Sequence, residues 1–235
     1  MCYSNSLSAS LIQLENTYRK GTSLLKDFSS IYLVSGFSLP IWPVITQEKN
    51  FVPMNWGLVP SWFRGTEPQE IANKTLNARI ETLEEKASFK HLVQHQRCII
   101  PSTGFFENQT LATHKKPFFI YPNQGSFFHM AGLYDRWVDV TSRLTYQSFT
   151  IITTEANNMM SEIHNTKKRM PLLLTEDEYH AYLQGDVAIN SLNPLPESYM
   201  SCHPVNKRIF TSTENNVPRV QHRMEDNIGT QGLLF

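Results

Sequence analysis

A cysteine stands directly after the initiator methionine in the opening sequence MCYS. Removal of Met1 would leave Cys2 with a free α-amino group next to its thiol. Such a 1,2-aminothiol converts an aldehyde first to an imine and then to a thiazolidine ring, whereas the nitrogen of an internal cysteine is an unreactive amide. Unperturbed pKa values of about 8 for the amine and about 8.5 for the thiol mean that modest help from neighbours activates both groups. The alternative is that Cys2 is an arbitrary residue after a start codon.

Two segments in the middle of the chain carry polar side chains suited to such chemistry. In TLNARIET, Asn77 and Arg79 are two residues apart, so on a β-strand they share one face. An amide that orients a reacting group beside a guanidinium that holds a phosphate is a workable pair, although a polar edge strand is the alternative. In IIPSTGFFEN, Glu107 follows two aromatic residues. An apolar surround raises the pKa of a carboxyl into the range of a general acid or base; a surface glutamate at a strand end is the alternative.

A histidine and a basic run follow later, in EIHNTKKRMPLLL. His164 ends a predicted helix and can move protons near neutral pH, while Lys168 and Arg169 belong to a run able to bind phosphate. A solvated loop with a histidine at the helix end is the alternative. In WGLVPSWF, Trp62 and Phe63 follow a proline turn and could stack on unpaired bases, although aromatic residues are more often part of the core.

Metal and disulfide chemistry are not predicted. His91 and His95 have the i, i+4 spacing of a zinc site on a helix, but the residues between them lack the glutamate of that motif. The three cysteines form no CxxC pair, which disfavours a disulfide framework and agrees with a reducing cytoplasm. We expect Cys98 and Cys202 to be structural and no cofactor to be required.

Composition excludes several classes of protein. The 235 residues are 40% hydrophobic and 18% charged, which excludes a disordered, collagenous or coiled-coil chain. Lys+Arg and Asp+Glu both number 21, so any site for an anion must be a local patch. No apolar run is long enough to span a bilayer, and the first residues lack the features of a secretory signal. We therefore expect a cytoplasmic protein without a membrane partner.

Hydrophobic periodicity predicts one mixed domain, mostly β with peripheral helices. The predicted helices cover residues 6–19, 84–95, 155–163 and 175–184. The predicted strands cover residues 31–37, 41–47, 51–58, 97–101, 116–121, 126–137 and 147–154. The domain is expected over residues 2–210, with a loosely ordered, polar C-terminal tail over 211–235.

The order of the motifs carries more information than any one of them. After Cys2 the chain contains WGLVPSW, LNARIET, PSTGFFE, PFFIY, AGLYDRW, IITTEAN, IHNTKKRMPLLL and HPV. This series resembles the SOS-response-associated peptidase (SRAP) family from residue 2 to about residue 208.

The resemblance implies an α+β fold, a single domain with a curved, barrel-like, mostly antiparallel β-sheet core and peripheral helices. It implies recognition of abasic sites in single-stranded DNA, where the lost base leaves a sugar that opens to an aldehyde. We expect the protein to be a monomer. The processed N-terminal cysteine would capture that aldehyde as a thiazolidine DNA–protein crosslink. Autoproteolytic removal of the first methionine and an abasic-site lyase activity are also implied.

The resemblance assigns the roles of the family's functional residues to the positions of this chain that match the family's motifs. Cys2 would be the nucleophile, Asn77 would hold the N-terminal residue or the sugar, and Glu107 and His164 would move protons. Binding of DNA is assigned to phosphate contacts and to stacking aromatic side chains: Arg79, Lys168, Arg169, Trp62 and Phe63.

The chain departs from the family pattern at several positions. The family usually begins with Met-Cys-Gly-Arg, whereas Tyr3 and Ser4 stand here. Asn108 replaces a frequent tryptophan after the glutamate, and the segment from His164 to Met170 is longer than in the shortest members. The basic fourth residue of the family is therefore missing as a phosphate contact.

Two other functions fit the same residues. A cysteine peptidase could use Cys2, His164 and Glu107 as nucleophile, base and orienting group, with the amine irrelevant. A non-covalent module for single-stranded DNA would use the aromatic and basic residues without chemistry.

Overall fold

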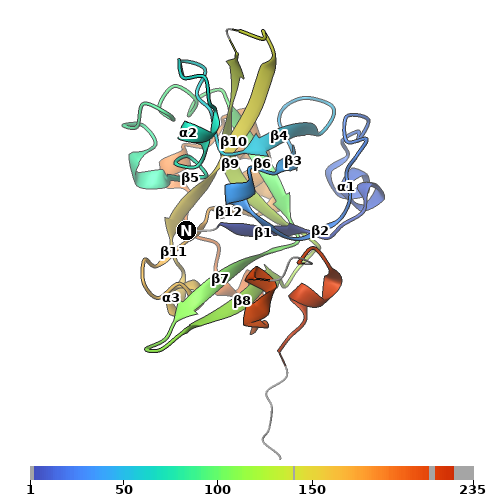
Figure 1. Cartoon of the computed structure of the whole chain (residues 1–235), viewed down its shortest axis with the longest axis vertical. Helices are drawn as coiled ribbons and strands as arrows, with labels where there is room; N and C mark the ends of the chain where they lie inside the picture. Colours follow the sequence, from blue (N-terminus) through green and yellow to red (C-terminus); the bar gives the residue numbers. More distant parts are fainter. Residues whose placement is uncertain (1–2, 140, 212–214, 225–235) are drawn as a thin grey trace, which may run out of the picture.

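The computed structural model of the protein describes residues 3–139, 141–211 and 215–224. Within these ranges the chain forms four α-helices and thirteen strands (Figure 1). The helices are α1 (Leu11–Tyr18), α2 (Gln69–Ala72), α3 (Asn158–Ile163) and α4 (Glu176–Gln184). The strands are β1 (Ser4–Leu7), β2 (Ile31–Ser35), β3 (Ile41–Val44), β4 (Val52–Trp56), β5 (Asn77–Arg79), β6 (Arg97–Ser102), β7 (Gly104–Thr110), β8 (Lys115–Pro122), β9 (Phe128–Val138), β10 (Thr145–Glu155), β11 (Arg169–Pro171), β12 (Leu173–Leu174) and β13 (Met200–Pro204).

The larger sheet is built around the long antiparallel pair β9 and β10. Its main path runs β12-β9-β10-β4-β3, with β5 and β11 also paired to β10 and β6 paired to β9. The sheet curves so far that a backbone bridge between Ile45 and Ile99 links the β3 edge to β6. One bridge joins these edges, so the sheet is strongly curved rather than a fully closed barrel. The expected α+β class with a curved, mostly antiparallel sheet is confirmed.

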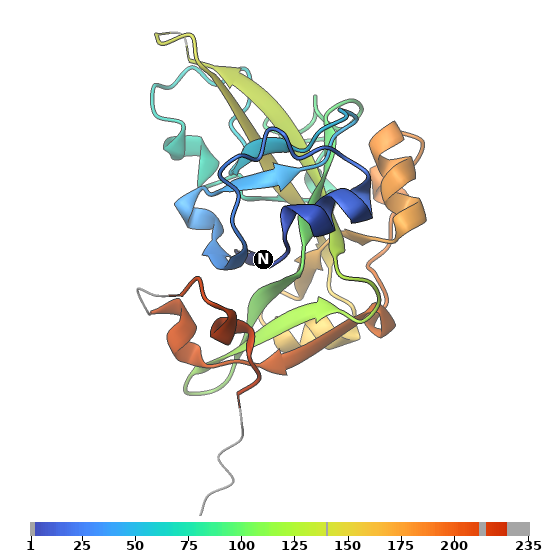
Figure 2. The same ribbon diagram turned by 90° about the vertical axis from the view of Figure 1, so that its right-hand side faces the viewer.

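The smaller sheet has the order β13-β8-β7-β1-β2 and places the first strand in its interior. β1 pairs with β7 on one side and with β2 on the other, both antiparallel. In the side view, this sheet lies at the end of the molecule opposite to the β9–β10 hairpin (Figure 2). Because β7 lies next to β1, residues near the amino end of the chain meet the GFFE segment.

Two buried tryptophans fix segments that lead to the site. Trp42 donates its indole N–H to the Pro101 carbonyl at 2.9 Å, and Trp56 donates to the Leu76 carbonyl at 2.9 Å. Both rings are fully buried in the main hydrophobic core. A buried indole N–H needs such a partner, so these bonds also fix the backbone just before β5 and near the end of β6.

The predicted helices 155–163 and 175–184 correspond to α3 and α4. Thr175 forms a capping box with Glu178 at the start of α4, and Gly185 ends the helix in the left-handed conformation. The helix predicted over 6–19 is shorter, since its first residues form β1 and α1 begins after the cap residue Ser10. No helix within the described ranges is long and apolar enough to cross a membrane.

The helix predicted over 84–95 is wrong, because the segment folds as successive turns. A tertiary hydrogen bond takes a carbonyl that a helix would need. The Ala87 carbonyl accepts from the indole of Trp62, 25 residues away, rather than from the backbone N–H of His91. Propensity favoured a helix here, and contacts with distant segments override it.

The expectation of a loose tail does not hold for residues 215–224. Pro218–Gln221 form a 3₁₀ turn, η6, in which Val220 is buried. Gln221 donates through Nε2 to Ser6 Oγ and to the Tyr32 carbonyl, so the segment is bonded to β1 and β2. The folded unit therefore extends beyond residue 210.

Candidate active site and DNA-binding groove

The amino end of β1 leads directly to Glu107. The register pairs Ser4 with Phe106 and Asn5 with Phe105, so Tyr3, the residue before β1, lies near Glu107 on the neighbouring strand. Tyr3, the first described residue, stands close enough that burial first, and then the charge of Glu107, raise the pKa of its phenol. Cys2, the predicted nucleophile, lies outside the described residues.

Glu107 is suited to exchange protons near neutral pH. Burial raises the pKa of Glu107 to about 7 against the opposing effects of a backbone hydrogen bond from Asn108 and the charge of Lys115. A carboxyl with such a pKa is populated in both its acid and base forms at pH 7. The chain therefore places a group capable of general acid and base chemistry beside the amino end of β1.

His164 is buried where α3 ends and is held in one orientation. Its Nδ1 lies 2.9 Å from the Arg169 carbonyl oxygen and 3.3 Å from the Arg169 backbone nitrogen. The shorter contact is to a group that only accepts, which favours the tautomer with the proton on Nδ1 and the lone pair on Nε2. Burial lowers the pKa of His164, and the charges of Lys167 and Arg169 lower it further, against the opposing hydrogen bond to Arg169. The ring is therefore neutral at pH 7 and can accept a proton at Nε2.

Glu107 and His164 come from elements that pack together. Two residues after Glu107 on the same face of β7, Gln109 donates to the Glu162 carbonyl of α3 at 3.1 Å. One residue further, Thr110 and Asn165 exchange two hydrogen bonds of 3.0 and 2.9 Å. The end of α3 thus runs along β7, and this packing brings the predicted acid–base pair to one side of the molecule.

Arg169, predicted to bind phosphate, lies in the interior. Its guanidinium forms a bidentate ion pair with Glu81 and donates to the Thr153 carbonyl at 2.6 Å. Only 5% of its side chain is exposed. This placement does not favour a phosphate contact; instead Arg169 holds β11 in place, and its carbonyl orients His164.

A groove of about 690 Å³ brings together four of the predicted residues, Asn77, Arg79, Trp62 and Phe63. Asn77 and Arg79 share one face of β5, as their spacing predicts, and both line this groove. Trp62 is 43% exposed, while Phe63 packs against Trp137 with ring centroids 6.1 Å apart. Of the two aromatic residues, Trp62 is therefore the better placed to stack on a base.

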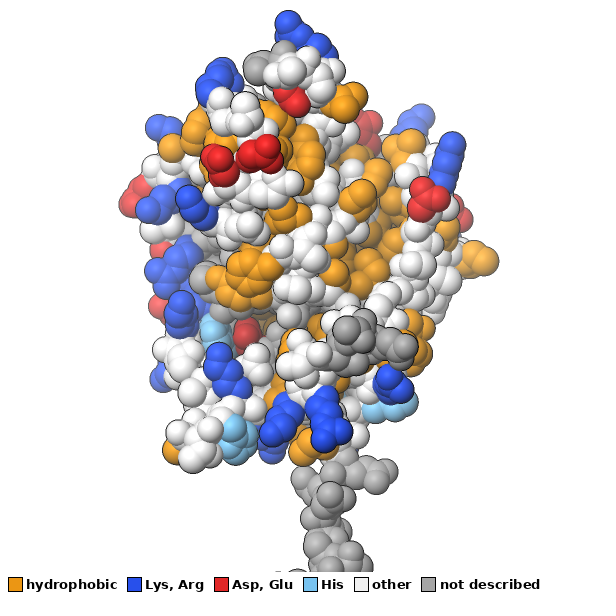
Figure 3. Space-filling view, in the orientation of Figure 1, with side chains coloured by type: hydrophobic (Ala, Val, Ile, Leu, Met, Phe, Trp, Pro, Cys, Tyr) orange, Lys and Arg blue, Asp and Glu red, His pale blue; other side chains and the backbone are white. Residues whose placement is uncertain are grey.

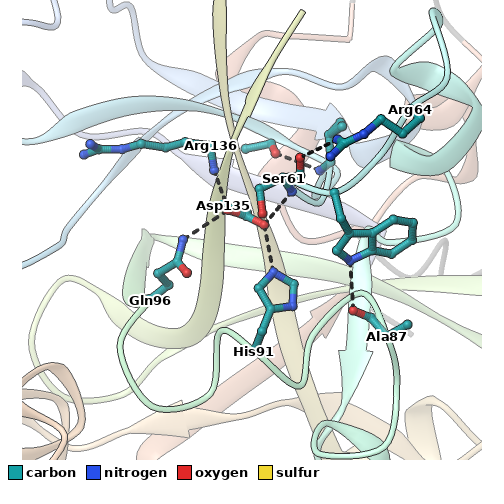
Figure 4. Close-up of polar contacts among 10 residues, drawn as sticks. Ser61, Arg64, Ala87, His91, Gln96, Asp135 and Arg136 are labelled. Carbon is teal, nitrogen blue, oxygen red and sulfur yellow. Dashed lines mark hydrogen bonds and ion pairs between the residues drawn. The ribbon is translucent and has the colours of Figure 1, made fainter.

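The loop that carries Trp62 is anchored by the buried carboxylate of Asp135 (Figure 4). Asp135 accepts from the backbone N–H of Ser61 at 2.7 Å and lies 3.1 Å from His91 Nε2. The indole of Trp62 donates to the Ala87 carbonyl at 3.1 Å. His91 is thus engaged with Asp135, and nowhere in the described ranges do three or more His, Cys, Asp or Glu side chains gather to hold a metal ion.

Basic side chains gather along one edge of the molecule. Figure 3 shows Lys and Arg side chains from the region of α2 and β5 down to α3 and the β7–β8 hairpin. Lys74, Arg79 and Lys86 line the groove, and Lys168 is exposed in the loop after His164. Because the net charge is zero, a site for an anion must be a local patch, and these side chains form such a patch.

The remaining predicted features have mostly structural surroundings. Tyr3 packs its ring on Phe37, with centroids 4.9 Å apart, and its carbonyl accepts from Gly36. Cys98 is fully buried and Cys202 half-buried, and both have free thiols. The pKa of each thiol is raised, by burial, which disfavours the reactive thiolate.

Sequence reasoning missed several residues of the site. Glu81 lies inside the LNARIET motif, two residues after Arg79, and Lys74 stands just before it, so both were within reach of motif reading. Asp135 gave no signal beyond its place in AGLYDRW, because its partners come from segments 39 to 74 residues away.

Comparison with known proteins places this geometry in a family context. The profile of the family described as SOS response associated peptidase (SRAP) matches residues 1–212. The chain is 32% identical over 197 residues to the abasic site processing protein HMCES of Xenopus tropicalis, a match that covers 74% of this chain and 57% of that protein. It is 34% identical over 173 residues to the abasic site processing protein YoqW of Bacillus subtilis, covering 71% and 74%.

Solved structures agree on the fold. A crystal structure of a protein from Bacteroides thetaiotaomicron superimposes with a TM-score of 0.91 at 34% identity, covering 95% of this chain and all of that one. A protein from Bordetella bronchiseptica gives a TM-score of 0.75 at 21% identity over 87% of this chain, a likeness of fold alone.

Proposed function

The chain belongs to the SOS response-associated peptidase family, and from this premise we propose that it processes abasic sites in single-stranded DNA. In this proposal the mature N-terminal Cys2 captures the ring-opened sugar as a covalent thiazolidine. The names of the relatives from Xenopus tropicalis and Bacillus subtilis, both abasic site processing proteins, support the substrate. The site described above supports the chemistry.

The reaction balances without a cofactor. The α-amine of Cys2 adds to the aldehyde carbon, and the resulting carbinolamine loses one water to give an imine. The thiol then adds its sulfur to the imine carbon while the imine nitrogen takes up a proton, which closes the ring. Release of Met1 by hydrolysis comes first, because an amide nitrogen cannot form the imine.

Glu107 and His164 supply the proton transfers in this scheme. Loss of water from the carbinolamine needs an acid, and addition of the amine needs a base. Glu107, with a pKa raised by burial to about 7, serves both steps. His164 is neutral at pH 7 because burial lowers its pKa, and it can exchange a proton with the sugar oxygen through Nε2.

The groove beside β5 would receive the DNA strand. Arg79, Lys74 and Lys86 offer charges to phosphates, and Trp62 offers a partly exposed indole for an unpaired base. A duplex would keep its bases stacked on each other, so this combination favours a single strand.

The observation that carries the proposal is the register of β1 on β7. The pairing of Ser4 with Phe106 brings Tyr3, the residue that follows Cys2 in the sequence, close to Glu107.

The experiment is incubation of the purified protein with a single-stranded oligonucleotide containing one abasic site, followed by denaturing electrophoresis. We expect a heat-stable shifted band with wild type, no band with Cys2→Ala, and a slower band with Glu107→Gln. An undiminished band with Cys2→Ala would refute the proposal.

Acetylation of the N-terminal amine separates the competing functions. It abolishes thiazolidine formation but leaves turnover by a thiol peptidase intact, because that mechanism does not use the amine. Binding that ignores whether a base is missing would point to a non-covalent module.

A further inference from the structure

The β7–β8 hairpin and the loop after His164 form one connected unit. Asn165 accepts from the backbone N–H of Thr110 at 3.0 Å and donates to its carbonyl at 2.9 Å. Gln109 makes a third link to the end of α3. A side-chain amide that replaces a missing backbone partner in this way fixes the loop on the hairpin.

Three exposed lysines project from this unit. Lys115 stands directly opposite Thr110 in the hairpin register, so it is a neighbour of the Asn165 clamp. Lys167 and Lys168 follow Asn165 by two and three residues. We call Lys115, Lys167 and Lys168 the hairpin cluster. Two exposed acids, Glu155 and Glu162, lie next to it against the three cations.

The hairpin cluster flanks the acid–base pair on the side away from the groove. In Figure 1, α2 and β5 lie above β11, whereas α3 and the hairpin lie below it. Lys115 lowers the pKa of Glu107 and Lys167 lowers that of His164, although burial dominates both shifts, so both ammonium groups lie near the pair. Figure 3 shows basic side chains on both sides of this position.

Backbone geometry holds the loop in this arrangement. Lys168 adopts the left-handed conformation with φ 48°, which residues other than Gly and Asn rarely do. Its N–H donates to the His164 carbonyl at 2.9 Å, and its carbonyl accepts from Ala156. The same turn that presents the Arg169 carbonyl to His164 therefore presents the lysines to solvent.

We propose that the hairpin cluster is a second phosphate-binding site, which holds the DNA strand on the side of the lesion opposite to the groove. The inference rests on the proposed function and deepens it, since the strand would be gripped on both sides of the abasic sugar. Each site would then contact phosphates on one side of the lesion only, one site on the 5′ side and the other on the 3′ side.

The test measures binding separately from chemistry. The probe is an oligonucleotide with a tetrahydrofuran residue, which lacks the aldehyde and cannot crosslink. Each phosphate contact to a single strand contributes about 0.7 to the slope of log affinity against log salt, or roughly fivefold at 0.1 M salt. We expect Lys115→Gln/Lys167→Gln to lose about 25-fold in affinity, and Lys26→Gln/Lys49→Gln, with the same charge change on exposed sites of another face, to lose little.

Two shorter oligonucleotides, one with nucleotides only 5′ of the tetrahydrofuran residue and one with nucleotides only 3′ of it, distinguish the two sites. We expect the Lys115→Gln/Lys167→Gln variant to bind one of these oligonucleotides more weakly than wild type does and to bind the other with an affinity within twofold of wild type. Lys74→Gln/Lys86→Gln in the groove should do the reverse. An equal loss of affinity for both oligonucleotides, or an affinity equal to that of the control variant, overturns the inference.

The two proposals fail separately. If wild type does not crosslink to a true abasic site, the proposed function fails, yet the tetrahydrofuran binding data still decide whether the hairpin cluster contacts phosphate. If wild type crosslinks but neither variant loses affinity for one side of the lesion only, the second phosphate site fails alone.

Discussion

At the scale of single residues, Glu107 links chemistry to stability. Burial raises its pKa from 4.5 to about 7, so between these pH values the folded state holds a proton that the unfolded chain has released. The unfolding free energy must therefore fall as pH rises through this window. A rise of this size corresponds to about 3 kcal/mol of stability given up for a carboxyl poised near neutral pH.

Glu107→Gln should remove that pH dependence. We expect the variant to be more stable than wild type at pH 8 by up to about 3 kcal/mol and similar at pH 4.5, since Gln cannot ionise. Its crosslinking rate should fall by roughly 10²- to 10⁴-fold, the usual contribution of general acid–base catalysis. Urea unfolding at both pH values and single-turnover kinetics provide the measurements.

The exposed Glu84→Gln is the matched control for this prediction and should change neither stability nor rate. Equal stability of wild type and Glu107→Gln at pH 8 would show that Glu107 is not desolvated in the way we describe.

At the scale of elements, the sequence predicted those whose signals are local. Seven strands rich in β-branched and aromatic residues were predicted, and α4 was predicted from its acidic first turn, but β1, β7 and β13 were not predicted. The turns over 84–95 were missed because Trp62, which takes the Ala87 carbonyl, lies outside that segment. The burial of Arg169 was missed because its partner Glu81 is 88 residues away.

The ion pair between Arg169 and Glu81 allows a test of positioning against phosphate binding. Arg169→Met should destabilise the protein by about 2 kcal/mol, less than a fully buried pair because Glu81 remains 45% exposed. Its salt slope for binding the tetrahydrofuran probe should equal that of wild type.

Arg79→Met is the comparison for this prediction. Arg79 is exposed in the groove, so we expect little change in stability and a salt slope less steep by about 0.7. If the Arg169 variant instead lost slope and kept its stability, Arg169 would be a phosphate contact, as its place in the basic run suggested.

At the scale of the whole molecule, the C-terminal segment packs against the first two strands. The second hydrophobic cluster unites residues from β2, β7 and β8 with Val205, Ile209 and Val220. The C-terminal segment 215–224, outside the part matched by the family profile, therefore helps to hold β1 and β2. No local pattern could predict this, because Ser6 and Gln221 are 215 residues apart.

Truncation tests this role. A chain ending at Thr211 should melt more than roughly 10 °C below one ending at Met224. It loses the burial of Val220, about 2 kcal/mol, and the hydrogen bonds that Asn216, Gln221 and Met224 make to the rest of the fold, about 1 kcal/mol each. The Met224 chain keeps every described residue and is the reference for thermal unfolding. Identical melting temperatures would show that the segment contributes nothing to the fold.

The central claim is that the amine and thiol of Cys2 act together on one aldehyde, and the intact mass of the crosslinked species tests it most directly. After borohydride treatment, the account predicts the summed masses of the abasic oligonucleotide and the protein without Met1, less one water. An imine made by the amine alone would have that mass before treatment but would gain two hydrogens, and this gain would also contradict the account. A crosslinked species that retains Met1, and so has no free amine on Cys2, would contradict it.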